Sequence, residues 1–272
     1  MKDKTIPYFV IALIISMSIG YLFGWDKTES TEYEEAVPVM SKNNIEDEIV
    51  DTDFEGIKIK QLNEKAKTYE LQVEIPLFGV KAIDQFFEEE AEQRIEHFIA
   101  LLEHSGNVSP SHQGAYFVTT DLYKSGKEFF SVVMAEETYT GGANFDQKSS
   151  VYLVDLLTED FVDPIDLFDQ PFEAQDKFFE LVEKNLRASD YYSNYIMEDQ
   201  LQEWLNQDQY DFSNVFIRDH NLVVKFDKYE VTAGVAGMPE VEVPIDEMKE
   251  FMNEEWLERI ESIDETTDEY YL

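Results

Sequence analysis

Residues 129–157 read FFSVVMAEETYTGGANFDQKSSVYLVDLL, two runs rich in valine and aromatic residues with a glycine pair between them. Such runs favour β-strands. Gly141 and Gly142 can adopt positive φ without a steric penalty, and they let the backbone pass close to another segment. The pattern predicts two strands joined by a tight connection, with Tyr139 packing beside it. A phosphate-binding loop is disfavoured because no helix amino terminus follows the glycines.

The sequence before these strands alternates between apolar and polar residues in the same way. Residues 114–139 predict a hairpin, and residues 56–62 and 67–76 predict two more strands. Between them, apolar residues recur at three- and four-residue steps over 80–104, which predicts one long amphipathic helix. We expect an antiparallel sheet with one face covered by this helix. Its apolar face comprises Ile83, Phe86, Phe87, Ala91, Ile95, Phe98, Ile99 and Leu102.

The sequence after the glycine pair predicts a second lobe. Helical periodicity covers 172–188 and 197–207, and residues 213–231 predict a hairpin that turns near His220 and Asn221. A last helix is expected over 246–260 with Asp246 as its N-cap. The predicted fold class is α+β, with antiparallel sheets covered by helices in two lobes, 54–150 and 151–263. An acidic tail follows over 264–272.

The amino terminus carries a candidate membrane anchor. Residues 6–25 read IPYFVIALIISMSIGYLFGW without a charge, and at ~1.5 Å per residue a helix of this length crosses a hydrocarbon core of about 30 Å. A cleaved signal peptide is the alternative, but Ser18 and Gly20, the small residues that could mark a cleavage site, lie inside the apolar run. Lys2 and Lys4 precede the span, so the rest of the chain is expected to face outward. Residues 1–25 are therefore interpreted as a short cytoplasmic end plus anchor, and the acidic residues 26–53 as a disordered tether.

The composition restricts the possible partners and chemistry. The 272 residues include 59 acidic and 21 basic side chains, a net charge of −38, so nucleic acid is excluded by repulsion. The same charge attracts cationic proteins, although acidic surfaces also keep extracellular proteins soluble whatever their function. Cysteine is absent, which removes disulfides, thiolate metal sites and cysteine nucleophiles.

Several short motifs occur in a characteristic order. They are YTGGANFD at 139–146, VYLVDLLTED at 151–160, PIDLF at 164–168, KYEVTAGVAG at 228–237 and the following VEVPIDEM. With the strand KTYELQVEIP and the long helix, they resemble the extracytoplasmic domain of the lysozyme-sensing anti-sigma-V factors and the paired domains ahead of the catalytic module in some peptidoglycan deacetylases. The resemblance covers about 54–251. It implies a deacetylase-type N-terminal lobe and an anti-sigma-V-type C-terminal lobe.

The resemblance also implies where a ligand binds. In that family alanine and histidine usually follow the glycine pair, whereas Asn144 stands in the histidine position here. The tyrosine motif normally continues with alanine, proline and tyrosine, a stretch that resembles part of a lysozyme-facing surface, and this chain departs from it. The expected ligand-binding residues are Tyr139, Gly141, Gly142, Asn144, Tyr229, Thr232, Ala233 and Gly234.

Catalytic signatures are weak in this sequence. The four histidines read as surface residues, and neither a serine elbow nor an EF-hand spacing is present. We expect a binding protein without catalytic residues, metal or cofactor. No cytoplasmic domain is expected, and hence no anti-sigma activity. Two alternatives stay open, namely a metal-assisted enzyme or deacetylase accessory domain acting on envelope polysaccharide through aspartates within 155–169, and a purely structural envelope protein.

Overall fold

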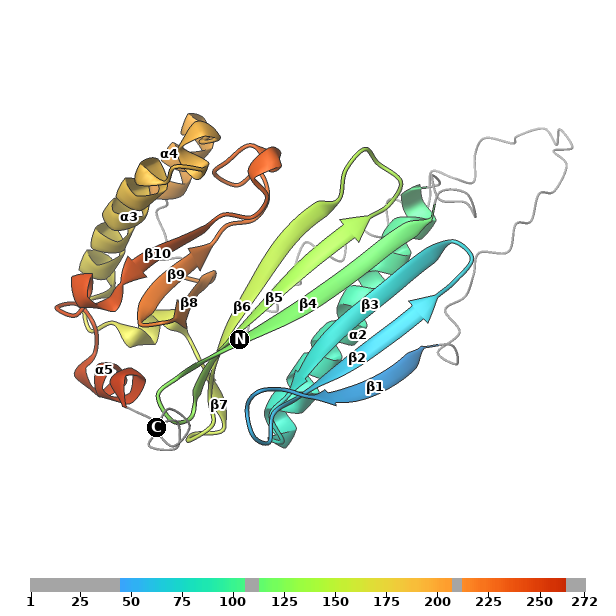
Figure 1. The fold of residues 1–272 in the computed structure, drawn as a ribbon, viewed down its shortest axis with the longest axis horizontal. Helices are drawn as coiled ribbons and strands as arrows, with labels where there is room; N and C mark the ends of the chain where they lie inside the picture. Colours follow the sequence, from blue (N-terminus) through green and yellow to red (C-terminus); the bar gives the residue numbers. More distant parts are fainter. Residues whose placement is uncertain (1–44, 106–112, 207–211, 263–272) are drawn as a thin grey trace, which may run out of the picture. The chain divides into compact units, whose positions relative to one another are not determined.

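The computed structural model describes residues 45–105, 113–206 and 212–262 (Figure 1). Seven strands form the larger sheet in the order β1-β2-β3-β4-β5-β6-β7. This mixed α+β fold with a mostly antiparallel sheet confirms the predicted class. The strands are β1 Glu46–Asp51, β2 Lys58–Lys65, β3 Tyr69–Leu77, β4 Gly114–Ser125, β5 Phe129–Tyr139, β6 Asp146–Asp155 and β7 Asp160–Val162.

One helix, α2 (Lys81–Ser105), covers a face of this sheet, close to the predicted range of 80–104 (Figure 1). Its apolar residues pack on alternate side chains of the strands, including Leu71, Val73, Tyr116 and Val132. Fully burying one such aliphatic side chain stabilises the fold by about 1.5–3 kcal/mol. The buried helix positions are Ile83, Phe87, Ala91, Ile95, Phe98 and Leu102, while Phe86 and Ile99 pack at the edge of the cluster.

Strands β3 and β4 pair in parallel, which differs from the antiparallel expectation. They are the two strands that α2 connects. The helix carries the chain back to the end of the sheet where β3 began, so the next strand runs in the same direction. The other neighbouring strands in this sheet pair antiparallel.

A second sheet has the order β10-β9-β8, with helices α3 and α4 on it (Figure 1). The predicted hairpin is confirmed between β8 and β9, where Asp219 and His220 take left-handed φ of 47° and 61° and form the turn. The elements are α3 Pro171–Ala188, α4 Glu198–Leu205, β8 Val215–Arg218, β9 Asn221–Lys225, β10 Glu240–Pro244 and α5 Glu254–Glu261, with 3₁₀ turns at Pro164–Leu167, Tyr192–Asn194, Gly234–Ala236 and Ile245–Glu247.

The predicted boundary between lobes at residue 150 falls inside β6. Strand β5 serves both hydrophobic cores: Phe130 and Val132 pack under α2, whereas Phe129 and Val133 pack against the second sheet. Successive strand residues point to opposite faces, so a single strand can belong to two cores. The amide of Ile217 also donates to Ser131 Oγ at 3.0 Å across this junction.

Two further expectations need correction. Residues 46–51, assigned to a disordered tether, form strand β1 on β2. Backbone pairing creates this strand, because its side chains are almost all exposed and show no alternation. The last helix begins at Glu254 rather than Asp246, and Asn253 is its N-cap, accepting from the amide of Glu255 at 3.0 Å. The amide of Asn253 donates to Leu167 O at 2.8 Å, which holds the preceding residues out of a helix.

Among the described residues, no helix has the length and apolar character needed to cross a lipid bilayer. The predicted anchor at 6–25, the tether residues 26–44 and the tail 264–272 lie outside the described residues.

Candidate ligand-binding surface

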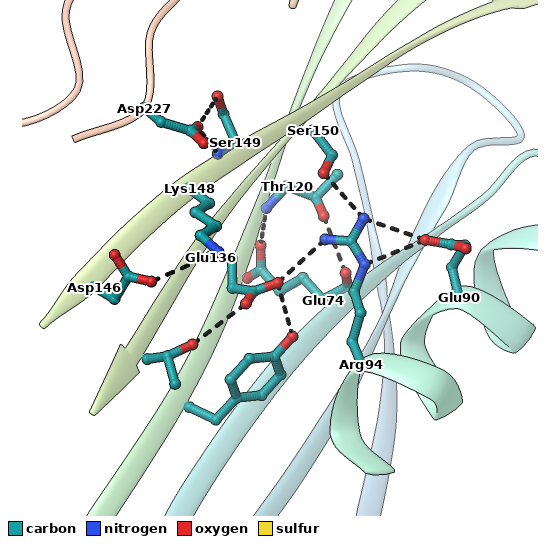
Figure 2. Close-up of polar contacts among 12 residues, drawn as sticks. Glu74, Glu90, Arg94, Thr120, Glu136, Asp146, Lys148, Ser149, Ser150 and Asp227 are labelled. Atoms are coloured by element: carbon teal, nitrogen blue, oxygen red, sulfur yellow. Dashed lines mark hydrogen bonds and ion pairs between the residues drawn. The ribbon is translucent and has the colours of Figure 1, made fainter. Parts of the chain in front are cut away.

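The two sequence motifs predicted to bind a ligand meet in the structure. The first lies in the β5–β6 connection (residues 140–145), and the second lies in the β9–β10 loop (residues 226–239). Asp227 accepts from the amide of Ser149 at 2.7 Å and from its hydroxyl at 3.2 Å (Figure 2). Lys228 Nζ donates to the carbonyl of Phe145 at 2.9 Å, and its amide donates to the carbonyl of Gln147 at 3.2 Å. These contacts join segments about 80 positions apart in the sequence.

Tyr139 lies at the end of β5 and packs beside the connection, as predicted. Its ring stacks on Phe145 with centroids 5.2 Å apart, and Phe145 stacks in turn on Phe117 at 6.3 Å. Gly141 has φ of 95°, a conformation that favours glycine. Gly142 and Asn144 are exposed. The glycine pair therefore makes a turn whose direction is fixed by the aromatic stack.

Tyr229 has a left-handed backbone with φ of 70°, which costs energy for a bulky side chain. Its ring lies against Gly234, where an added Cβ would come within 2.2 Å of the ring. The Nζ of Lys228 lies 5.6 Å from the centroid of the same ring. Strain of this kind persists only where surrounding contacts maintain it, and such positions concentrate at functional sites.

The outer side of the β9–β10 loop presents apolar groups to solvent. Tyr229 is 50% exposed and Val235 is 70% exposed. Tyr191, 52% exposed, lies next to them and donates a long hydrogen bond of 3.4 Å to the carbonyl of Val235. We call Tyr191, Tyr229 and Val235 the tyrosine surface. Exposed aromatic groups on a fixed backbone resemble the anchors of protein interfaces.

The inner side of the loop is tied to the segment before α4. Thr232 pairs with Ile196, and the amide of Ala233 donates to Tyr195 O at 2.8 Å. Thr232 is fully buried, and its Oγ1 has no hydrogen-bond partner among the described residues. Thr232 and Ala233 thus hold the inner side of the loop against Tyr195 and Ile196, while Tyr229 and Gly234 form its outer side.

The face of β5 and β6 that points toward α2 carries a polar cluster centred on Arg94 of α2 (Figure 2). Its guanidinium donates to Glu90 at 3.2 Å, to Ser150 and Tyr152 at 3.0 Å each, and to Glu136 at 3.4 Å. Burial raises the pKa of Tyr152 despite the nearby positive charge of Arg94. This hydroxyl therefore stays protonated at neutral pH. Because Ser149 and Ser150 are neighbours in β6, the cluster fixes the strand that Asp227 contacts on its other face.

The structure separates the aspartates considered for a metal-assisted enzyme. Asp155 binds Arg259, Asp163 accepts from the amide of Ile165 at 3.1 Å, and Asp169 accepts from Asn253 at 2.8 Å. These aspartates do not form a group of potential metal ligands within the described ranges.

A different group, His220, Asp246 and Glu261, does converge, and the sequence pattern gave no sign of it. All three side chains are exposed. The ammonium of Lys249 already lies 2.7 Å from an oxygen of each carboxylate. Sequence reasoning also missed Asp227, Lys228, Tyr191 and Val235 as parts of the surface, although Lys228 and Val235 lie within the motif KYEVTAGVAG at 228–237.

Comparisons with known proteins agree with this fold. Residues 165–246 match the family described as a protein of unknown function, DUF3298. The chain is 20% identical over 260 residues to the peptidoglycan-N-acetylmuramic acid deacetylase PdaC of Bacillus subtilis strain 168, covering 95% of this chain and 53% of that protein. The chain therefore spans about half the length of this curated relative.

Two solved structures of DUF3298 family members share the fold. The protein from Bacteroides fragilis NCTC 9343 is 13% identical, with a TM-score of 0.52 over 77% of this chain and 94% of that one. The protein from Pseudomonas aeruginosa PAO1 is 12% identical, with a TM-score of 0.50 over 77% and 95%. The resemblance noted from the motifs is thus supported in part, by the DUF3298 match over residues 165–246 and by the similarity to a peptidoglycan deacetylase.

Proposed function

We propose that this chain is a single-pass, membrane-anchored binding module of the bacterial cell envelope, with its folded domain on the outer side. The DUF3298 match and the similarity to a peptidoglycan deacetylase support an envelope-associated role. Residues 6–25 supply the anchor in this proposal, and the lysines before them orient it. The domain binds its ligand without catalysing a reaction, and it needs no cofactor.

The ligand in this proposal is a cationic or wall-associated protein, such as a lysozyme, held on the tyrosine surface. The observation that carries the proposal is the convergence of the β5–β6 connection and the β9–β10 loop through Asp227 and Lys228. This convergence presents exposed apolar groups on a strained, well-supported loop. Interfaces obtain most of their affinity from a few such anchors, and pre-organisation lowers the entropic cost of binding.

Calorimetric titration of the full chain with lysozyme, in 50 mM and 150 mM salt, tests the proposal. We expect saturable binding that weakens with salt, because the chain is strongly acidic. Tyr229→Ala combined with Val235→Ala should weaken it by about tenfold or more. Gly234→Ala should do the same while retaining Tyr229, because the new methyl group displaces the ring.

The matched control is Leu157→Ala combined with Phe172→Ala, which removes two side chains of similar exposure, 66% and 69%, elsewhere on the surface. Affinity should change less than about twofold in this variant. Equal losses in both double variants would reject the tyrosine surface. If no heat of binding is measured at both salt concentrations, lysozyme is excluded as the ligand.

A further inference from the structure

The larger sheet has a second face that α2 does not cover. On β2 and β3, Leu71 and Val73 point toward α2, so Gln61, Asn63 and Gln72 point the other way. The second sheet covers this face around Phe129, Val133 and Leu153, with Tyr123 and Val151 packed beside them. On β2 and β3, Ile59 and Pro76 of this face are buried, and the other side chains are exposed or half-buried. We call the exposed and half-buried part of this face the open face; its polar and aromatic members include Glu46, Glu48, Gln61, Asn63, Lys65, Glu70, Gln72, Glu74, Phe117, Thr119, Asp121, Glu137, Tyr139 and Gln147.

Cross-strand pairing arranges these side chains in rows. One row runs from Glu46 through Asn63, Gln72 and Phe117 to Glu137. Neighbouring strands lie about 4.8 Å apart, so the carboxylates in a row are separated by amide or aromatic side chains. Five glutamates face a single lysine, Lys65, which lies 3.6 Å from Glu70. The open face is therefore strongly negative.

Hydrogen bonds fix several of these carboxylates in place. Glu74 accepts from Gln61 Nε2 at 3.3 Å and from the amide of Thr120 at 2.9 Å (Figure 2). Glu137 accepts from Gln147 Nε2. A carboxylate already held by hydrogen bonds loses little side-chain entropy on binding. The open face is thus pre-organised for positive charge.

A depression of about 250 Å³ lies at one end of the open face, where β2 ends and β3 begins. Its lining comprises Glu46, Glu64 and Glu70, the cation Lys65, and Asn63, Leu71 and Gln72. Glu64 pairs with Leu71, so its side chain points toward α2, where it is only 7% exposed and accepts from the hydroxyl of Tyr69 at 3.0 Å. Burial, followed by the contact with Glu64, raises the pKa of Tyr69, so this hydroxyl remains a donor. Glu46 and Glu70 outnumber Lys65 in this lining, so the depression is net negative on the open face and suits the head group of one lysine or arginine side chain.

We propose that the open face docks a basic polypeptide, with one of its lysine or arginine side chains in the depression beside Glu46 and Glu70. The stretches 26–44, 207–211 and 263–272 of this chain are themselves net acidic, and a second copy carries −38, so charge excludes these occupants. A glycan is disfavoured because Tyr139, Phe145 and Phe117 stack on one another, which occupies ring faces that a sugar would need. This surface is separate from the tyrosine surface and goes beyond the proposed function.

Titration of the full chain with a decalysine peptide in 150 mM salt tests the inference. The variant Glu46→Gln, Glu48→Gln, Glu70→Gln should bind at least about tenfold more weakly. The matched control, Glu89→Gln, Glu96→Gln, Glu103→Gln, removes the same charge from exposed positions on α2 and should lose less than about threefold. Thermal melts of both variants establish that they fold.

Two outcomes of these titrations would contradict the inference. Equal losses in the two triple variants would mean that the peptide responds to net charge alone. Tighter binding of a glucosamine hexamer than of decalysine, abolished in the open-face variant, would identify a glycan surface instead. Failure of the proposed function is distinguishable, because Tyr229→Ala should leave decalysine binding unchanged within about twofold.

Discussion

At the scale of single residues, Asp155 shows how one carboxylate holds the end of the fold. It is fully buried at the end of β6, and it accepts from Arg259 of α5, from Thr158 Oγ1 at 2.7 Å and from the amide of Leu157 at 3.0 Å. Burial alone would raise its pKa, but the hydrogen bonds from Arg259, Thr158 and Leu157 outweigh this and hold the pKa below its usual value. The ionised carboxylate is therefore the form that the folded protein stabilises.

Asp155→Asn should lower the free energy of unfolding by about 2–4 kcal/mol, because it leaves Arg259 without its partner. In the natural chain the stabilisation is fully present above the unfolded pKa of about 3.9 and is lost as pH falls through the lower, folded pKa. Urea unfolding at pH 7 and at pH 3 measures both effects. The difference between variant and natural chain should shrink at pH 3. The same change at exposed Asp166 is the control, and a similar loss there would contradict the assignment.

At the scale of elements, α2 is held to the sheet by Arg94 as well as by its apolar face. The Arg94 side chain is only 18% exposed, and it contacts both Glu90 of its own helix and Glu136 of β5. On α3, Arg187 also contacts two glutamates, Glu183 and Glu198, but at an exposed position. Arg94 and Arg187 therefore allow the same interaction, one arginine with two glutamates, to be compared at a buried and at an exposed position.

Arg94→Gln should destabilise the protein by about 1–3 kcal/mol, since two partly buried carboxylates and Tyr152 lose a charged donor. Arg187→Gln should cost less than about 1 kcal/mol, as is usual for exposed ion pairs. Denaturant midpoints of the two variants, with unchanged slopes, give the comparison. Equal midpoints would show that the Arg94 cluster contributes no more than a surface pair.

The elements also show what the sequence can predict. The period of α2 and the hairpin turn depend on local patterns, so both were predictable, although the turn lies at Asp219 and His220, one residue before the predicted His220 and Asn221. Strand β1 was not, because its six residues are exposed and only backbone pairing defines them. The parallel pairing of β3 with β4 follows from the path of α2 rather than from any strand residue. The contact of Asp227 with Ser149 joins residues 78 positions apart, and no local pattern records it.

At the scale of the whole molecule, charge is the dominant feature. The chain carries 59 acidic and 21 basic side chains, so most carboxylates cannot be paired. Among residues 45–105, 113–206 and 212–262, many of the ion pairs are exposed, for example Lys58 with Asp51 and Lys184 with Glu247. Exposed pairs contribute little, whereas repulsion among unpaired carboxylates destabilises the compact state. Repulsion should therefore outweigh attraction in the response to salt.

We predict that the thermal midpoint of the full chain rises with sodium chloride between 10 mM and 500 mM. The Debye length falls from about 30 Å to less than 10 Å over this range, which screens the repulsion across the surface. A gain of about 1–2 kcal/mol corresponds to a rise of roughly 2–8 °C for a domain of this size. Potassium chloride at equal ionic strength should give the same rise, because screening depends on ionic strength and not on the identity of the cation. A midpoint that falls with salt would mean that specific ion pairs such as Asp155 with Arg259 outweigh the net charge of the chain.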